Sequence, residues 1–430
     1  MLDIRFVKEN SDVVKESIKK RFKQAKLSLV DDSIGLYDQW LKLKKESDDL
    51  RAQRNKVSEE INKLQKSGKD IKEKVKEIKQ IPEKIKQIEE KQNELHTNLN
   101  KTLKQIPNLL HSSVPIGEDE SKNKILRTFG TKTKFSFLPK SHTDIIENLE
   151  LVELERAAKV SGARFYYIKD ELVELEWALI KFAMDYLKKK GFTLIRTPNM
   201  ARSEAIEGAA ELGDFNETLY GIKDEDLFLV ATAEHTLASL HMNEMLTCEL
   251  PYKYAGISEC FRKEAGAHGK DQKGIFRVHE FRKVEQFIYS NPKDSYKHME
   301  EIVKNAEELF KKLKLPYRVV NIASGALNDT AAKKCDIEIW MPAQKEYREL
   351  VSVSNCLDYQ SRKLGIRFKG KDGTFHPHLI NGTAIATPRI LVAIIENFQQ
   401  KDGSIKIPAV LHKYLGFKKI SPKKKPHSKR

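Results

Sequence analysis

Apolar side chains recur at alternating steps of four and three along residues 36–64, with charged and amide side chains between them. This is the spacing of a coiled-coil seam. The seam positions are Leu36, Trp40, Leu43, Ser47, Leu50, Arg54, Val57, Ile61 and Leu64. A second apolar series covers residues 71–106, and Pro82 is expected to kink it or to remove one of its hydrogen bonds. Pro107 is expected to end it.

The segment Ser67-Gly68-Lys69-Asp70 between the two series is typical of a tight turn. Two helices of similar length joined by a short turn run antiparallel. At 1.5 Å per residue each would be roughly 50 Å long. The pattern therefore predicts a helical hairpin over about 33–106. A coil that dimerises with a second chain is the alternative, but the tight turn favours pairing within one chain.

The remainder of the chain has the mixed pattern of a globular α+β domain. The stretch 111–123 has loop composition, and residues 171–190 form an amphipathic helical pattern that Gly191 closes. Short β-rich runs follow without a regular alternation of strand and helix, which favours a largely antiparallel sheet flanked by helices. The predicted strands are 192–196, 227–231, 252–258, 276–289, 317–322, 335–341 and 349–354.

Charge is distributed unevenly along the 430 residues, whose formal net charge is +16. Residues 1–110 carry 26 Lys and Arg against 19 Asp and Glu, and residues 418–430 carry seven positive charges and no acid. Residues 111–417 are therefore almost neutral. We expect an N-terminal domain over 1–110, a globular domain over 111–417 and a basic disordered tail over 418–430. The excess of positive charge indicates a polyanionic partner.

Several classes of protein are disfavoured by what the sequence lacks. No apolar run approaches the ~18 residues that span a bilayer, and the charged start MLDIRFVKEN is unlike a secretory signal. The four cysteines have no CxxC spacing, which fits a reducing compartment. Neither GxGxxG nor GxxxxGK[ST] occurs. We expect a cytoplasmic protein without a membrane segment.

Four separate segments carry residues suited to binding a nucleotide. In 261–281, Arg262 and Glu264 are two residues apart on a predicted strand, and an arginine fork grips phosphate. Phe281 can stack on a base. Arg389 stands at the start of an apolar helix, where the helix terminus favours anions. Glu349 and Ser352 offer oxygen ligands of the kind that Mg²⁺ prefers beside phosphates, and Thr232 and Glu234 can present a hydroxyl and a carboxylate to one pocket.

Each segment alone has an ordinary structural explanation, such as a β-hairpin with cross-strand ion pairs or a helix start with an incidental arginine. Their order along the chain is more specific, because it resembles the three signature motifs of class II aminoacyl-tRNA synthetases. Within that class the chain resembles the seryl-tRNA synthetase family in its archaeal and eukaryotic cytosolic style. The strings that carry the resemblance are FRKEAGAHGKDQKGIFRVHEFRKVEQF (261–287), MPAQKEYRELVSVSNCLDYQSRK (341–363) and NGTAIATPR (381–389).

The resemblance, which covers residues 1–417, implies an ATP-dependent ligase that charges serine tRNA. It implies the class II antiparallel sheet preceded by a long coiled-coil arm, a homodimer with residues 191–198 at its interface, and an arm that binds tRNA(Ser). It implies ATP as substrate and Mg²⁺. Serine would contact Thr232, Ala233, Glu234, Arg262, Glu285 and Thr383. ATP would contact Arg262, Lys263, Glu264, Val278, Phe281, Glu349, Leu350, Val351, Ser352 and Arg389. Arg262, Glu349 and Arg389 would be catalytic, and Glu349 and Ser352 would bind the metal.

Two alternatives remain open at this point. A synthetase-like paralogue could activate an amino acid and transfer it to a carrier protein, and a catalytically inactive relative could serve as an RNA-binding scaffold. The hairpin argues against the first. The presence of Arg262, Glu264, Glu349 and Arg389 argues against the second.

Overall fold

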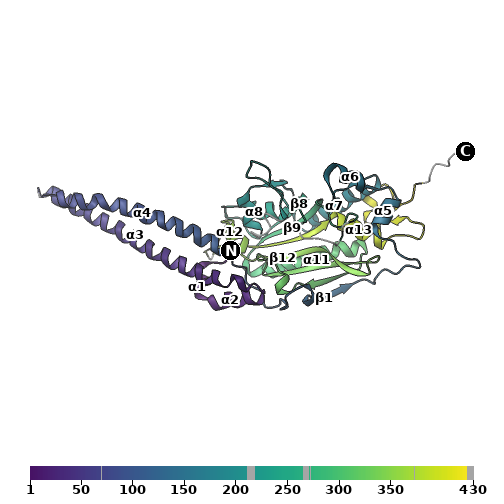
Figure 1. Cartoon of the computed structure of the whole chain (residues 1–430), viewed down its shortest axis with the longest axis horizontal. Helices are drawn as coiled ribbons and strands as arrows, with labels where there is room; N and C mark the ends of the chain where they lie inside the picture. Colours follow the sequence, from purple (N-terminus) through teal and green to yellow (C-terminus); the bar gives the residue numbers. More distant parts are fainter. Residues whose placement is uncertain (69, 211–217, 265–270, 272, 372, 424–430) are drawn as a thin grey trace. The chain divides into compact units, whose positions relative to one another are not determined.

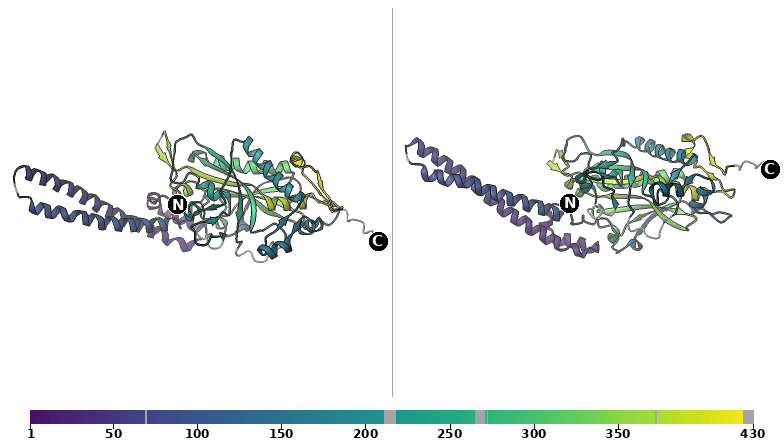
Figure 2. Two further views of the ribbon diagram at one scale, coloured as in Figure 1. Left: turned by 90° about the horizontal axis from the view of Figure 1, so that it is seen from above. Right: turned by 45° about the horizontal axis from the view of Figure 1, so that its top comes forward.

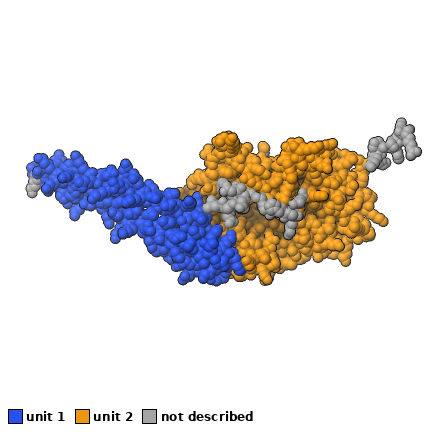
Figure 3. Space-filling view, viewed as in Figure 1, with its two compact units in different colours: residues 1–109 blue, residues 110–430 orange. Residues whose placement is uncertain are grey.

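The computed structural model describes residues 1–68, 70–210, 218–264, 271, 273–371 and 373–423. The chain divides into two compact units, residues 1–109 and residues 110–430 (Figure 3).

Unit 1 is built from two long helices that lie side by side, α3 (Ser28–Lys66) and α4 (Lys72–Leu103), as Figures 1 and 2 show. The predicted antiparallel hairpin is confirmed. It begins a few residues earlier than expected, and α4 ends before Ile106. Pro82 lies inside α4, so the helix tolerates the missing N–H. Gly68 has φ +70°, the left-handed conformation that lets the chain leave α3.

The seam between α3 and α4 is apolar and its edges carry ion pairs. Val57 on α3 is buried, and so are Ile81, Ile85, Ile88 and Leu99 on α4. At the edges, Arg51 Nη2 lies 2.5 Å from Glu89 Oε1 and Lys74 Nζ lies 3.0 Å from Glu60 Oε2. The short helices at the start of the unit, α1 (Ile4–Glu9), α2 (Ser11–Lys20) and η1 (Gln24–Lys26), precede α3 and bury Val7, Val14 and Ile18.

Unit 2 is organised around an eight-stranded sheet of order β1-β10-β11-β12-β15-β9-β8-β4. All neighbouring strands are antiparallel except β4 and β8, which are parallel. The predicted fold class is confirmed. The strands are β1 (Lys124–Phe129), β4 (Thr193–Arg196), β8 (Tyr252–Phe261), β9 (Glu280–Ser290), β10 (Tyr317–Asn321), β11 (Lys333–Met341), β12 (Glu346–Asn355) and β15 (His378–Ala386).

The two faces of this sheet are covered by different helices. On one face, a Cβ added to Gly382 of β15 would lie 2.6 Å from Ile302 of α11 (Ser295–Leu313), so this helix packs directly on the strand. Helices α7 (Glu171–Lys189) and α13 (Thr387–Asn397) share the same apolar core. On the other face, a Cβ on Gly256 of β8 would lie 2.7 Å from Leu237 of α10 (Ala233–Ala238). The face toward α10 is the one that carries the polar side chains described below.

Shorter elements complete unit 2. The helices are η2 (Glu120–Lys122), α5 (His142–Asn148), α6 (Leu154–Ser161), α8 (Ser203–Ala209), η3 (Pro292–Asp294), η4 (Ser324–Ala326), α12 (Tyr359–Lys363) and η5 (Ala409–Tyr414). The strands of the small sheets are β2 (Val152–Glu153), β3 (Tyr167–Ile168), β5 (Met200–Ala201), β6 (Phe228–Leu229), β7 (Met245–Leu246), β13 (Arg367–Gly370), β14 (Gly373–Phe375), β16 (Ile405–Lys406) and β17 (Lys419–Ile420). Among the described residues, no helix is both long and apolar enough to cross a membrane.

The segment expected to be a disordered tail from residue 418 begins instead as a strand. Lys419 and Ile420 form β17 and pair with β16. Ile420 is only 1% exposed and belongs to the core cluster, and Lys419 Nζ lies 2.7 Å from Asp402 Oδ2. The prediction of disorder is wrong for these residues. It rested on the many lysines of the segment, and the single isoleucine among them, which is buried in the structure, did not change the average composition. Residues 424–430 lie outside the described residues.

Candidate active site

A cavity of about 440 Å³ opens on the α10 face of the central strands. Its wall is mostly polar, and its residues come from loops, helix starts and four strands that are distant in sequence. They are Thr232, Glu234, Arg262, Glu264, Phe276, Arg277, Val278, Phe281, Lys283, Glu285, Asn328, Lys334, Glu349, Leu350, Ser352, Ser354, Asn381, Thr383, Ala386, Pro388 and Arg389.

The floor of the cavity contains a buried pair of side chains on adjacent strands. Glu285 of β9 and Thr383 of β15 are register partners, so their side chains project from the same face. Thr383 Oγ1 donates a hydrogen bond to Glu285 Oε2 over 3.2 Å, and Lys283 Nζ lies 2.8 Å from the same oxygen. All three side chains are less than a tenth exposed. They form a small polar pocket in which a hydroxyl or an amine can be recognised by direct hydrogen bonds.

Glu234 stands beside this pocket in the first turn of α10. Thr232 caps the helix, because its Oγ1 accepts a hydrogen bond from the Glu234 backbone N–H over 3.1 Å. Gln360 and Asn381 donate to Glu234 Oε1 over 2.9 and 3.0 Å. Burial, together with the negative charge of Glu285, raises the pKa of Glu234 to about 7. A ligand cation placed against this carboxyl would therefore favour its ionised form.

Glu349 reaches the cavity because β12 contains a bulge. Glu349 pairs with Glu338 and Val351 pairs with Ile337, so Leu350 is an extra residue without a partner on β11. In a regular strand Glu349 would share a face with Val351, which is fully buried. The bulge turns Glu349 to the face that carries Ser352.

Charges of both signs meet around Glu349. Ser352 Oγ donates to Glu349 Oε1 over 2.9 Å, and Arg389 Nη1 donates to the Glu349 carbonyl oxygen over 3.0 Å. Burial alone would raise the pKa of Glu349, but Lys334, Arg389 and Arg262, with the Ser352 hydrogen bond, lower it to about 2. Burial raises the pKa of neighbouring Asp336 to about 7, although Lys334 Nζ lies 3.2 Å from its carboxylate. The positive side chains outnumber the ionised carboxylates at this end, which suits a polyanion.

The sequence predicts that Arg262 and Glu264 lie on a strand. This prediction is wrong, because β8 ends at Phe261. The Arg262 backbone N–H still donates to the His279 carbonyl oxygen over 2.9 Å, and its Nε donates to the Ala231 carbonyl oxygen over 3.3 Å. Glu264 has φ +48°, and its carboxylate lies 2.7 Å from Arg277 Nη1. The left-handed residue breaks the strand geometry and turns Glu264 toward Arg277.

Two phenyl rings border the cavity next to arginines. The Arg262 guanidinium lies 5.3 Å from the centre of the Phe281 ring, and the Arg389 guanidinium lies 5.4 Å from the centre of the Phe276 ring. Phe276 was predicted to lie in a strand, but β9 begins only at Glu280. Its ring is buried at the cavity wall.

Most of the residues named from the sequence meet in this cavity, and three do not line it. Ala233 is buried against β8, Val351 belongs to the opposite apolar core, and Lys263 Nζ lies 5.9 Å from the Tyr220 ring centre. Those that line it are Thr232, Glu234, Arg262, Glu264, Val278, Phe281, Glu285, Glu349, Leu350, Ser352, Thr383 and Arg389.

Sequence reasoning missed several residues of the wall, most of which follow from the alternation of strands. Lys283 lies two residues before Glu285, and Ser354 lies two residues after Ser352, so each shares the face of a residue already named. Lys334 belongs to β11, which begins at Lys333, two residues before the predicted start at residue 335. Asn328 and Phe276 lie in loops, and no local pattern marks them.

Comparison with known proteins identifies the family. The model of the seryl-tRNA synthetase N-terminal domain matches residues 1–110, and that of the tRNA synthetase class II core domain (G, H, P, S and T) matches residues 220–398. A serine–tRNA ligase of Pyrococcus horikoshii is 46% identical, over 99% of this chain and 98% of that protein. The chain belongs to the seryl-tRNA synthetase family.

Solved structures of the family have the same fold. The seryl-tRNA synthetase of P. horikoshii, solved in complex with ATP, matches with a TM-score of 0.94 at 45% identity, over 99% of this chain and 100% of that one. The cytoplasmic serine–tRNA ligase of Naegleria fowleri, solved in complex with AMP, matches with a TM-score of 0.88 at 37% identity, over 99% of each chain.

Proposed function

We propose that this protein activates L-serine with ATP and transfers the seryl group to the 3′ end of tRNA(Ser). The observation that carries the proposal is the arrangement of one cavity. A small pocket for an amino acid lies at one end, cations for phosphates lie at the other, and an aromatic ring borders them. Membership of the seryl-tRNA synthetase family supports it, as do the ATP and AMP complexes of the two related structures.

The serine end fits its substrate by charge and by hydrogen bonds. Glu234 would accept the ammonium group with Thr232 beside it, and the pair Glu285 and Thr383 would bind the serine hydroxyl. Alanine would be rejected because it would leave these buried polar groups without a partner, a loss that reaches roughly 10⁴–10⁵-fold in comparable sites. Ala233 contributes its helix position only, since its side chain faces β8.

The ATP end would hold adenine against Phe281, with Val278 and Glu264 at its border, and the phosphates between Arg262 and Arg389. The serine carboxylate attacks the α-phosphorus, a new P–O bond forms, and the bond to diphosphate breaks. No protein nucleophile is needed, so positioning and charge stabilisation supply the catalysis. Arg262, Glu349 and Arg389 are the proposed catalytic residues. Leu350 borders the cavity, while Lys263 and Val351, which the family resemblance places at ATP, do not line it.

Mg²⁺ fits the donor set at this end. Glu349 Oε1 and Ser352 Oγ are 2.9 Å apart and are both hard oxygen donors, and Mg²⁺ in such sites takes its other ligands from phosphates and water. Among the described residues, no group of three or more His, Cys, Asp or Glu could hold a metal by itself. We propose that Glu349 and Ser352 would hold Mg²⁺ together with ATP, where the ion would screen the charge of the phosphates.

The second step needs a ribose hydroxyl of tRNA beside the seryl carbonyl. A second cavity of about 360 Å³ shares Thr232, Glu234 and Arg262 with the first, and it offers an approach from the serine end. We propose that the α3–α4 hairpin of the N-terminal domain, residues 1–110, binds the tRNA through Lys and Arg contacts to phosphate. Residues 111–417 would then form the catalytic domain.

The protein is further proposed to be a cytoplasmic homodimer. Trp177 of α7, Leu194 of β4 and Met200 of β5 are 50%, 37% and 46% exposed, and large apolar side chains at a surface are typical of an interface. Leu194 lies within residues 191–198, where the family resemblance places the dimer contact, and Met200 lies just after them. The four cysteines are free, which suits a reducing compartment, and the N. fowleri relative is described as cytoplasmic.

The paralogue functions are less well supported. A carrier-protein ligase has no use for a hairpin of this length, and an inactive scaffold has no reason to keep buried charges at the cavity. Serine-dependent exchange of diphosphate into ATP, followed by charging of a serine tRNA transcript, tests all three. Exchange with charging supports the proposal, exchange alone would favour the ligase, and neither would favour the scaffold.

A further inference from the structure

Arg348 lies behind the ATP end of the cavity and contributes nothing to its lining. It precedes Glu349 in β12, but its guanidinium points toward Asp271. Arg348 Nη2 lies 2.5 Å from Asp271 Oδ2, and Nη1 lies 3.2 Å from Asp271 Oδ1. This is the two-point fork that arginine makes with a carboxylate. The side chains are only 18% and 10% exposed, so water screens the pair weakly.

The same guanidinium packs on a residue that does line the cavity. It lies 4.4 Å from the centre of the Phe276 ring, to which Arg389 also lies close from the cavity side. Asp271 Oδ2 in turn lies 3.9 Å from Arg277 Nε. Arg348 thus contacts Phe276 directly and reaches Arg277 through Asp271.

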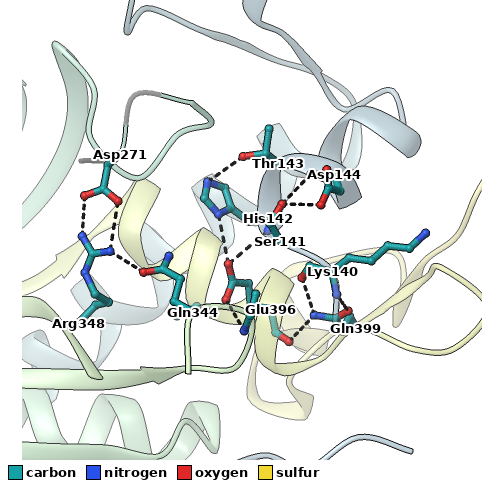
Figure 4. A network of polar contacts seen from close by, with 12 residues as sticks. Lys140, Ser141, His142, Thr143, Asp144, Asp271, Gln344, Arg348, Glu396 and Gln399 are labelled. Atoms are coloured by element: carbon teal, nitrogen blue, oxygen red, sulfur yellow. Dashed lines mark hydrogen bonds and ion pairs between the residues drawn. The ribbon is translucent and has the colours of Figure 1, made fainter. Parts of the chain in front are cut away.

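The position of Arg348 is itself fixed by a network that Figure 4 shows. Gln344 Oε1 accepts a hydrogen bond from Arg348 Nη1 over 2.5 Å. The neighbouring Ala343 N–H donates to Glu396 Oε2 over 3.2 Å. Glu396 is fully buried in α13, the helix that carries Arg389 at its start, and its other oxygen lies 3.2 Å from His142 Nδ1. The guanidinium is therefore held from the core.

A second contact holds the backbone at Gly274, two residues before Phe276. A Cβ at Gly274 would lie 2.2 Å from His142 Nε2 and 2.6 Å from Thr143 Oγ1, so the backbone there touches α5. Gly274 also has φ +82°. Asp271 is thus held by Arg348 of β12 and the Gly274 backbone by α5, a few residues before Phe276 and Arg277.

We propose that Arg348 is a positioning residue for ATP, which sets Phe276 and Arg277 on the cavity wall through its fork to Asp271. This inference rests on the proposed function, because it assumes that the cavity binds ATP. It assigns no chemistry to Arg348. A loosened fork would let the phenyl ring and the Arg277 guanidinium shift, so ATP would bind more weakly while the serine pocket stayed intact.

The test uses the full-length protein and the exchange reaction, with ATP and serine varied separately. Arg348→Lys keeps the charge and loses the fork. Asp271→Asn keeps the shape and loses the charge. Each is expected to raise the KM for ATP about tenfold, the size of one charge-assisted hydrogen bond. The KM for serine is expected to stay within about twofold. The KM for ATP of the double variant should not exceed that of the single variant with the higher KM, because both substitutions break the same fork.

Arg318→Gln is the matched control. Arg318 pairs with Glu338 across β10 and β11 and lies 4.8 Å from the Tyr347 ring centre, but none of these residues lines the cavity. Its loss should lower the unfolding temperature and leave both KM values unchanged. Three results for the Arg348 and Asp271 variants would overturn the proposal. The KM values for ATP and serine could rise equally, or the two increases in the KM for ATP could multiply in the double variant. A loss of thermal stability with an unchanged KM for ATP would also contradict it. If the wild-type protein showed no exchange, the proposed function itself would have failed.

Discussion

The hairpin of unit 1 and the cavity of unit 2 are both rich in charged side chains, yet these differ in exposure. In the hairpin, Arg51 and Glu89 form an ion pair with side chains 52% and 42% exposed. In the cavity, Lys283 and Glu285 form one with side chains 8% and 2% exposed. Exposed pairs are worth about 0–1 kcal/mol and leave their charges available to a partner. Buried pairs are costly unless fully hydrogen-bonded.

The difference separates two kinds of recognition. Exposed lysines and arginines can follow the phosphates of a large RNA, and their contacts weaken as salt rises. Buried charges are held in place and can discriminate single atoms, because a buried group that loses its partner cannot form a hydrogen bond with water instead. Residue type is the same in both regions, and exposure determines which role it can serve.

The largest expected effect comes from a substitution in the cavity. Glu285→Ala should lower serine activation by roughly 10⁴-fold, since it removes a buried acceptor and leaves Lys283 without its partner. Exchange kinetics measure the loss, and circular dichroism checks that the variant is folded. Glu155→Gln, on an exposed position of α6, serves as the control. Near-normal exchange by the Glu285 variant would remove this residue from the serine site.

The next effect separates the two regions. Arg51 and Glu89 face each other across the hairpin, so residues 52–88 can be replaced by a Gly-Ser-Gly turn. Charging of tRNA(Ser) should fall about a hundredfold because phosphate contacts are lost, while diphosphate exchange stays at the wild-type rate. The two assays on one preparation give the answer. Undiminished charging would contradict the role of the hairpin.

A smaller effect comes from the titration of Glu234. Its pKa is raised to about 7, so its carboxyl is mostly neutral at pH 6 and mostly ionised at pH 7.5. Because the serine ammonium needs the ionised form, the KM for serine should fall about eightfold between these pH values. Glu234→Gln cannot ionise and should show a high, flat profile. An equally steep profile in that variant would assign the titration to another group.

The smallest effect concerns the seam of the hairpin. Ser47 is 2% exposed and its Oγ has no hydrogen-bond partner, so the hydroxyl is buried at a cost. Ser47→Ala should stabilise unit 1 by about 1 kcal/mol. Thermal unfolding followed at 222 nm, with exchange as the second readout, tests it. A lower unfolding temperature would show that the hydroxyl has a stabilising role.

The two regions also differ in how far the sequence could describe them. The hairpin follows from local periodicity, because each turn of α3 meets α4 in a regular order. In the cavity, Arg262, Glu285, Thr383 and Arg389 were named from their motifs, and all of them line it. These motifs could be recognised from the sequence because the spacing of residues within each one is local, and their order along the chain indicated the family.

What the sequence alone determined, then, was which elements form, which family they match and which side chains are candidates. Tertiary structure decided their orientation. The bulge at Leu350 turns Glu349 to the cavity, the left-handed Glu264 faces Arg277, and Ile420 docks on the core as a strand. These outcomes depend on partners outside the local pattern: Ile337 and Glu338 of β11 for the bulge, Arg277 for Glu264, and Ile405 of β16 for Ile420. The local pattern of apolar and polar residues does not predict such contacts, because packing selects the conformation only once the sheet has assembled.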